Sequence, residues 1–288
     1  AAVMVMLPYP LFGTLVVNAE YGVKLLRPVA VGSRVRVRAA FTGGARPGQR
    51  LYRLTAEAVA EDGTPLATGS YVSVFGSRLA AGLQVAQSLP LPQEMAGTLA
   101  LVAGRPLPLH FTSAGQLNAI LPYNIADSTT HQLIVRRGNT LSVPEPVLVA
   151  AAQPAVFSVD GTGQGQGHIY GVEADALVLA DSRRPVKPGE VVVVYATGLG
   201  PVRPAAAAGE AAPSSPLALV EGTVRVSIQE EDAQVVFAGL APGFTGLYQL
   251  NVVVPEGVTA DASARLVITV DGSPSAAVTL ATASGPTL

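Results

Sequence analysis

The chain has 288 residues, of which 49% are apolar and 13% charged, and its net charge is −2. This composition excludes a disordered chain. The Lys and Arg residues are scattered, which excludes a basic nucleic-acid-binding face. The absence of Cys excludes disulfides, thiolate catalysis and zinc–thiolate sites. The 30 Gly and 23 Pro residues, together with Val, Thr and Ser in the periodic segments, predict an all-β protein with short strands and many turns.

Residues 1–19 contain no charged side chain. Pro8 and Pro10 argue against a membrane helix, so we predict an extended apolar segment and no membrane span. A segment that is apolar on both faces must be buried, either as the first strand of its own subunit's core or as a donor strand that completes a neighbouring copy's sheet. A remnant of a signal or anchor segment is the third interpretation. The candidate subunit-contact face, read at period 2, consists of Val3, Val5, Leu7, Tyr9 and Leu11.

Residues 20–66 are predicted to form a small β unit. Strict alternation in Arg34-Val35-Arg36-Val37-Arg38 places two valines on one strand face and three arginines on the other. The arginine row fits a solvated strand face, or alternatively an anion-binding face. A further strand is expected at Leu51–Ala60, and Glu61-Asp62-Gly63 predicts a turn before the next strand.

A repeated pattern organises the rest of the chain. Turn residues, a run of β-branched residues and Gly punctuation occur in Thr68–Leu79 and again in Lys187–Pro201. The longer apolar run of the second copy predicts a strand that is buried on both faces. We therefore predict tandem immunoglobulin-like β-sandwich domains at residues 67–153 and 187–288. In the first domain we expect strands at Val72–Phe75, Thr98–Val102, Pro106–Phe111, Gln116–Leu121, His131–Arg136 and Val147–Ala150.

Residues 154–186 are predicted to bridge the two domains. The stretch from Asp160 to His168 alternates with glycine, but it lacks the Lys-Ser/Thr pair of a phosphate loop. Asp160 is its one carboxylate, whereas a calcium loop needs several oxygen ligands. We therefore expect a mobile or tight-turning loop at residues 160–168, without a metal.

The sequence Gln-Leu-Asn, followed by three apolar residues and Pro, occurs in both domains. The offset between the copies is about 120 residues at the first anchor and about 133 at this one, which indicates an insertion at Pro204–Pro216. Two amides that flank a Leu lie on one strand face and can satisfy polar groups nearby, or alternatively bind a ligand. The structural repeat motif consists of Gln116, Asn118, Gln249 and Asn251.

Longer motifs between residues 68 and 283 resemble a known family. They are Gly69–Leu79, Ser113–Pro122, Pro154–Gly167, Pro188–Pro201, Ala212–Leu217 and Phe237–Asn251. In this order they resemble the C-terminal region of a large, mostly uncharacterised family of secreted bacterial proteins, whose domains are similar to the immunoglobulin-like IPT/TIG fold. The resemblance implies export to the extracellular space or the cell surface, and it implies no catalytic residue. The small residues Ala1 and Ala2 are also typical of the end that signal peptidase leaves.

No catalytic constellation is visible in the sequence. His110, His131 and His168 lie in no recognised motif, and Gly-X-Ser-X-Gly is absent. The acidic clusters Glu61-Asp62 and Glu230-Glu231-Asp232 fall where hairpin turns are expected, which favours solvated turns over glycosidase carboxylates. We therefore predict no catalytic, cofactor-binding or metal-ligating residue, no cofactor, and a protein that is not an enzyme.

Three functions follow from these patterns. The first is an exported structural protein that self-associates into a homopolymer, as a subunit of an extracellular fibre or surface assembly joined by β-strand addition. The alternative is an adhesion module that binds a surface glycan or a protein, although 7 Phe, 8 Tyr and no Trp supply few residues for stacking on sugars. The third is an enzyme, either a degraded hot-dog hydrolase or an unrecognised glycosidase.

Overall fold

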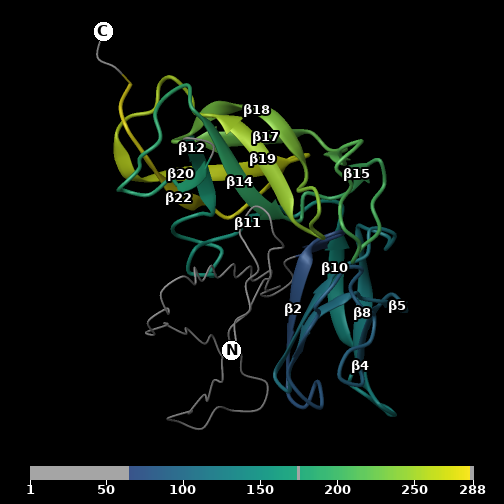
Figure 1. The fold of residues 1–288 in the computed structure, drawn as a ribbon. Helices are drawn as coiled ribbons and strands as arrows, with labels where there is room; N and C mark the ends of the chain where they lie inside the picture. Colours follow the sequence, from purple (N-terminus) through teal and green to yellow (C-terminus); the bar gives the residue numbers. More distant parts are fainter. Residues whose placement is uncertain (1–64, 174–175, 286–288) are drawn as a thin grey trace.

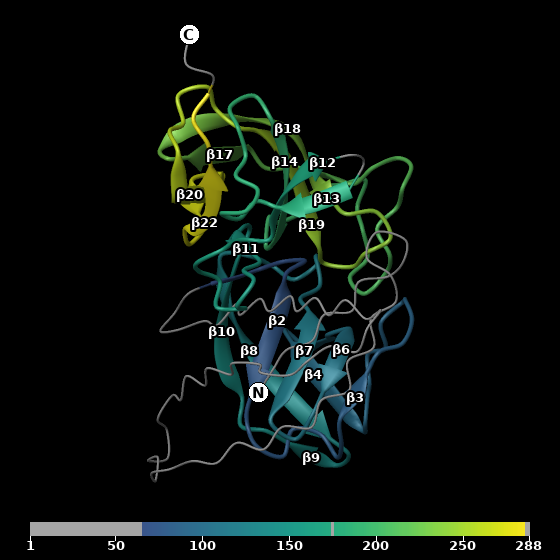
Figure 2. The same cartoon turned by 60° about the vertical axis from the view of Figure 1, so that its left-hand side comes forward.

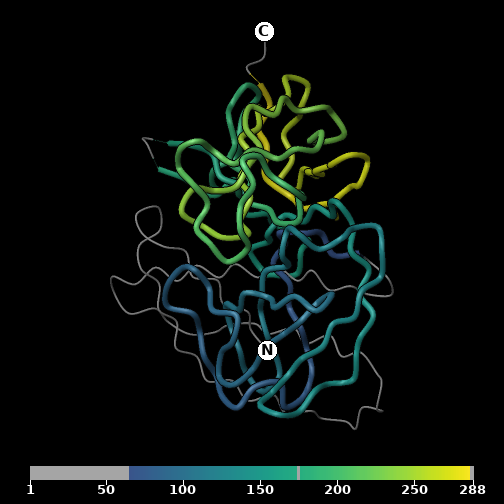
Figure 3. The backbone as a smooth tube through the Cα atoms, turned by 90° about the vertical axis from the view of Figure 1, so that its right-hand side faces the viewer, coloured from purple at the N-terminus to yellow at the C-terminus, as the bar shows by residue number. Residues whose placement is uncertain are grey.

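The computed structural model describes residues 65–173 and 176–285 (Figure 1). Every regular element in these residues is a β-strand, and the strands form two modules, at residues 65–153 and 154–285 (Figure 2). The modules are separate lobes that meet end to end (Figure 3). The predicted fold class, all-β with tandem immunoglobulin-like sandwiches, is confirmed for the described residues. The predictions for residues 1–19 and 20–64, including the donor strand and the arginine row, lie outside them.

The first module is a sandwich of two sheets. One sheet has the order β2 (Tyr71–Phe75), β7 (Gln116–Ile120), β6 (Leu109–Thr112) and β3 (Gln84–Val85). The other has the order β1 (Leu66–Ala67), β10 (Glu145–Ala150), β8 (Thr129–Arg137), β4 (Thr98–Val102) and β5 (Arg105–Pro106), with β9 (Thr140–Leu141) beside β8. Alternate side chains of these strands, such as Val72, Leu117 and Val149, fill the core between the sheets.

Strand β4 has the predicted bounds, but the strand expected at Pro106–Phe111 is divided into β5 and β6. Pro106 and Pro108 have no N–H group, so this stretch cannot continue one hydrogen-bond ladder. The Leu107 N–H donates to Ala100 of β4 at 2.9 Å, and the chain then crosses to the other sheet.

The second module contains the longer strands. Its central strands are β12 (Ile169–Glu173), β14 (Val191–Thr197), β19 (Tyr248–Val253) and β18 (Glu231–Leu240), in this order. β18 pairs with β17 (Val224–Ile228) over Glu231–Ala233 and with β19 from Gln234 onward, with a register shift between Val235 and Phe237. The remaining strands are β11 (Ala155–Val156), β13 (Ala176–Leu179), β15 (Val202–Arg203), β16 (Leu219–Val220), β20 (Asp261–Val270), β21 (Ser273–Pro274) and β22 (Val278–Thr282).

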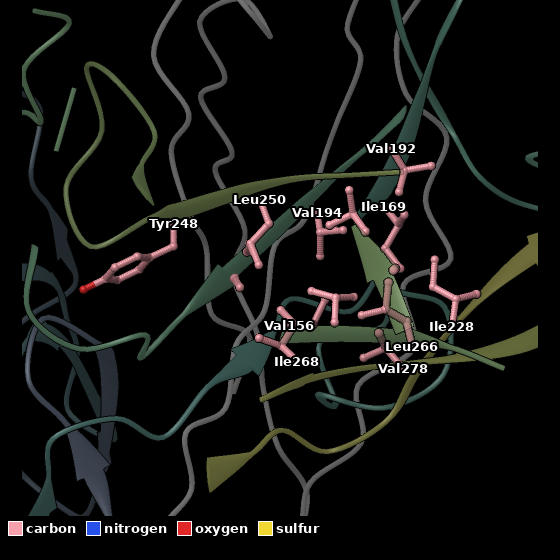
Figure 4. Close-up of a cluster of buried hydrophobic side chains, with 14 of the residues drawn as sticks. Val156, Ile169, Val192, Val194, Ile228, Tyr248, Leu250, Leu266, Ile268 and Val278 are labelled. Atoms are coloured by element: carbon pink, nitrogen blue, oxygen red, sulfur yellow. The ribbon is translucent and has the colours of Figure 1, made fainter. Parts of the chain in front are cut away.

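The core of the second module lies between β14 and β19 on one side and β17, β20 and β22 on the other (Figure 4). Val192, Val194 and Leu250 point toward Ile268 and Leu266, and all five side chains are fully buried. Val193 and Tyr195 are buried on the opposite face of β14, and only Val191, at the start of the strand, is exposed. The prediction of a strand buried on both faces is therefore confirmed for β14.

Residues 154–186 differ from the expected bridge. β11 and β12 both pair with β14, and β13 pairs with β12, so these residues belong to the sheet of the second module. β12 contains Gly171 and ends in Glu173, so it lacks the continuous apolar run that marks β14. The loop at 160–168 is a tight turn, in which the Asp160 carboxylate accepts hydrogen bonds from the Thr162 N–H (3.0 Å) and hydroxyl (2.8 Å).

The sequence repeat corresponds to a repeat in strand pairing. Asn118 of β7 lies opposite Ser73 of β2, and Asn251 of β19 lies opposite Val193 of β14. The partners Ser73 and Val193 are separated by the offset of about 120 residues that the sequence indicates. β2 and β7 in the first module are thus the counterparts of β14 and β19 in the second.

Candidate functional site

The two modules meet in an apolar cluster, which we call the junction. Tyr71 and Ile120 of the first module pack there with Val193 and Tyr195 from the outer face of β14. All of its main members are buried, and their burial stabilises one arrangement of the two modules. They are Tyr71, Leu91, Ile120, Phe157, Tyr170, Val193, Tyr195, Ala241, Phe244 and Leu247.

Backbone contacts at the end of β14 fix the junction further. The Thr197 hydroxyl accepts a hydrogen bond from the Tyr71 N–H at 3.0 Å and donates to the Gly246 carbonyl at 3.2 Å. The N–H of Gln153, in the linker between the modules, donates to the Gly198 carbonyl at 2.9 Å. One buried hydroxyl therefore bonds to backbone groups of both modules.

A buried tyrosine, Tyr248, and a half-buried one, Tyr123, lie beside this linker. The Tyr248 hydroxyl donates to the Gly200 carbonyl and lies 3.4 Å from the Tyr123 hydroxyl. Burial raises the pKa of Tyr123 to about 12, and burial also raises the pKa of Tyr248 well above its ordinary value. Both phenols are neutral at physiological pH, so they act as hydrogen-bonding groups rather than as bases.

The repeated amides form the same hydrogen bond in both modules. The Gln116 Nε2 group donates to Asn118 Oδ1 at 2.7 Å, and Gln249 Nε2 donates to Asn251 Oδ1 at 2.9 Å. The first pair is fully buried, whereas the second is half-buried. The Ser73 hydroxyl of β2 also donates to Asn118 Oδ1, at 3.1 Å.

Polar atoms on the outer face of β6 and β7 lack partners. Gln116 Oε1, Asn118 Nδ2 and His110 Nδ1 are buried without a hydrogen bond. Burial lowers the pKa of the His110 imidazole to about 4, and its ring lies edge-on to Tyr71 at 5.9 Å. An unpaired buried donor or acceptor costs about 1–3 kcal/mol, so this face carries polar groups that its own module does not satisfy.

β2 is an edge strand in the described residues. The Gly76 N–H bonds toward β7 at 3.2 Å, whereas the Tyr71 N–H bonds away from β7 to Thr197. Backbone groups of successive strand residues point to opposite sides. The N–H and C=O groups of Ser73 and Phe75 therefore point to the outer edge, where no described strand pairs with them.

The remaining candidates for chemistry are dispersed. His131 Nε2 lies 2.7 Å from the Ala126 carbonyl, and His168 Nδ1 lies 2.7 Å from the Tyr170 hydroxyl. Glu230 and Glu231 lie at the β17–β18 hairpin, where a turn was predicted. Within residues 65–173 and 176–285, no three His, Asp or Glu side chains gather as a metal site would require.

The sequence patterns do not single out the residues that form the junction. The Gly-Leu-Gly run after β14 is typical of a turn, yet Gly198 and Gly200 lie against the backbone of the linker. The signal was present, because two glycines directly after a buried strand are also typical of close backbone approach. The position of β2 at the end of a sheet, among the described strands, left no signal, since it depends on which strands pair.

Comparison with known proteins identifies no family, since no family profile and no curated protein matches the chain. The surface glycan-binding protein PbSGBP-B from Prevotella bryantii is 11% identical, with a TM-score of 0.24, over 80% of this chain and 41% of that one. Domains 5 and 6 of the S-layer protein SbsC are 11% identical, with a TM-score of 0.24, over 80% of this chain and 98% of theirs. A tandem of titin domains is 8% identical, with a TM-score of 0.21, over 80% of this chain and 65% of that one.

The chain thus spans less than half the length of the glycan-binding protein that it matches. At these identities the likeness concerns the fold alone. Two of these similar structures come from cell-surface proteins. In the described part of this chain, no helix is long and apolar enough to span a membrane.

Proposed function

We propose that this protein is an exported structural protein, a subunit of an extracellular fibre or surface assembly in which copies are joined by β-strand addition. The observation that carries the proposal is the junction. Its buried apolar cluster holds two sandwiches in one arrangement, as a building block of an assembly requires. The resemblance of residues 68–283 to a secreted family supports the extracellular location.

The proposal includes the absence of enzymatic activity. A general base must reach a substrate and titrate near the working pH. His110 is buried with a pKa of about 4, and the phenols of Tyr123 and Tyr248 are buried and neutral. These groups support a structural role for the most perturbed side chains of the described residues.

Deleting residues 1–12 is expected to abolish assembly and leave a folded monomer. The described sandwiches have their own cores, whereas the deleted stretch has no charge and must be buried somewhere. The measurement is electron microscopy with sedimentation of the full chain and the deletion variant, and circular dichroism controls for folding. Fibres that persist after the deletion would contradict strand addition by this segment.

An adhesion module is the second candidate, because one end of the first module exposes apolar side chains. Leu141 is 65% exposed and Val143 is 85% exposed, beside the β8–β9 hairpin. Exposed apolar residues in a loop are typical of a protein-binding surface. In this case Leu141→Ser/Val143→Ser loses binding on an array of glycans and matrix proteins, whereas deletion of residues 1–12 retains it. The opposite pattern on the array would exclude this candidate.

A further inference from the structure

A long loop of the second module, between β15 and β16, reaches the first module. It contains Pro204–Pro216, the insertion that makes the repeat about 13 residues longer in the second module than in the first. The loop extends from β15 toward the first module (Figure 1). Loops of more than about 12 residues without regular structure are uncommon in compact domains and usually carry a function. We call Pro204–Pro216 the strap.

Gly209 is the point at which the strap meets the first module. The buried Gly209 carbonyl accepts a hydrogen bond from the Leu91 N–H at 2.8 Å. A Cβ atom at Gly209 would lie 2.7 Å from the Cβ atom of Pro108, and Gly209 has φ +86°. Only glycine combines this backbone conformation with so close an approach. Beside it, Ala208 of the strap packs against the apolar cluster of the junction.

The strap is also fixed to its own module. The Gly209 N–H donates to the buried Thr245 hydroxyl at 3.0 Å. The Ala212 N–H donates to the Phe244 carbonyl at 2.7 Å, and the Ala212 carbonyl accepts a hydrogen bond from the Gly243 N–H at 2.8 Å. Phe244 is itself a member of the junction. Hydrogen bonds to the strap's backbone therefore define its path from its own module to the first one.

The contact at Gly209 is separate from the contact at the end of β14. There, the Thr197 hydroxyl accepts a hydrogen bond from the Tyr71 N–H on β2. Pro108, which Gly209 touches, comes directly before β6, and β7 lies between β2 and β6 in the sheet. Two strand spacings place the two contacts about 10 Å apart. Two modules that are joined at one point can rotate about it, whereas a second contact away from that point prevents the rotation.

We propose that the strap is a conformational device that holds the two modules at one angle, and that loss of its contact at Gly209 allows them to rotate about the linker at Gln153. This inference goes beyond the proposed function, because it concerns the shape of a single copy and not the way in which copies join.

The absence of Cys allows the angle between the modules to be measured with site-specific labels. Leu141→Cys in the first module and Val236→Cys in the second are 65% and 59% exposed positions for nitroxide spin labels. Pulsed electron spin resonance of the doubly labelled full chain gives the distribution of distances between the labels. Dilution with unlabelled protein restricts the measurement to distances within one copy. We expect one narrow distribution when the strap is unchanged.

Gly209→Ala tests the contact with the first module. The added methyl group meets the ring of Pro108, which has no other rotamer to adopt, so the strap is displaced. We expect a distance distribution that is roughly twofold broader, because modules without a fixed contact move relative to each other. The matched control is Gly243→Ala, where φ is +82° and no atom lies within 4 Å of the added Cβ. It has a similar backbone cost and is expected to keep the narrow distribution.

A second strap variant replaces Ala206–Glu210 by two glycines, which removes the contact at Gly209 altogether and is expected to broaden the distribution as Gly209→Ala does. Urea unfolding of each variant measures whether both modules stay folded. A narrow distribution in both strap variants would show that the junction alone sets the angle, and it would overturn the proposal. Equal broadening in Gly243→Ala would assign the effect to backbone strain in the second module, which would also overturn the role of the contact with Pro108.

Discussion

Gly198→Ala lowers the free energy of unfolding by an amount on the order of 3 kcal/mol. Gly198 has φ +76°, and a Cβ atom there would lie 2.2 Å from the Gln153 carbonyl oxygen in the linker between the modules. The obstacle is backbone, so no side-chain rotation relieves it. The Gln153 N–H also donates to Gly198 at 2.9 Å, so the added methyl group forces apart a hydrogen-bonded contact at the junction.

The matched control is Gly272→Ala in the same module. Gly272 has φ +86°, yet no atom lies within 4 Å of the added Cβ, so this variant loses only about 1 kcal/mol through backbone strain. Urea unfolding measures both variants, and small-angle scattering measures the arrangement of the modules. Equal stability losses in the two variants would show that the close approach of Gly198 to the linker contributes nothing.

Much of the architecture could be predicted, because local patterns of apolar and polar residues along the sequence determine where these strands form and which faces they bury. The apolar run of β14 indicates burial on both faces, and Val193 and Tyr195 are buried in the junction as that pattern requires. The repeated Gln-Leu-Asn sequence lies on strands that pair equivalently in the two modules, although its amides are fully buried in the first and half-buried in the second. In both modules the Gln side chain donates to the Asn side chain, at 2.7 and 2.9 Å.

The membership of residues 154–186 could not be predicted in this way. Ile169 and Gly171 form a strand because Val194 and Val192 lie beside them, far away in the sequence. The stretch that contains them includes Gly171 and ends in Glu173, so its local sequence pattern resembles that of a loop. Propensity describes how well a side chain fits a pleated surface, and here the neighbouring strand decides the outcome.

The residues of the candidate site could not be predicted from the sequence, for a related reason. Whether a strand lies at the end of a sheet depends on which strands pair with it, so nothing in Ser73 or Phe75 identifies β2 as an edge strand among the described residues. The lack of a hydrogen bond to Gln116 Oε1 likewise depends on what surrounds this atom in space. Sequence patterns predict the donor face in residues 1–19, and it stays a prediction because these residues lie outside the described chain.

The stability of the wild-type protein falls by about 3 kcal/mol more than that of His110→Leu between pH 6.5 and pH 4. Burial lowers the pKa of His110 from its ordinary value of 6.5 to about 4. Above pH 6.5 the imidazole is neutral in both the folded and the unfolded chain, so it contributes no pH dependence. Between 6.5 and 4 only the unfolded chain takes up the proton, which stabilises unfolding, and below 4 both states are protonated and the difference stays constant.

Comparing the two proteins isolates this one group, because all other titrating residues are present in both. At pH 7 the substitution is expected to be tolerated, since the Nδ1 atom that it removes is buried without a partner. His110→Phe retains a ring beside Tyr71 and serves as a second variant if leucine packs poorly. The measurement is urea unfolding at a series of pH values from 7 to 4. Parallel curves for the wild type and both variants would mean that the imidazole charges freely in the folded protein, and that the outer face of β6 is open to water rather than closed over it.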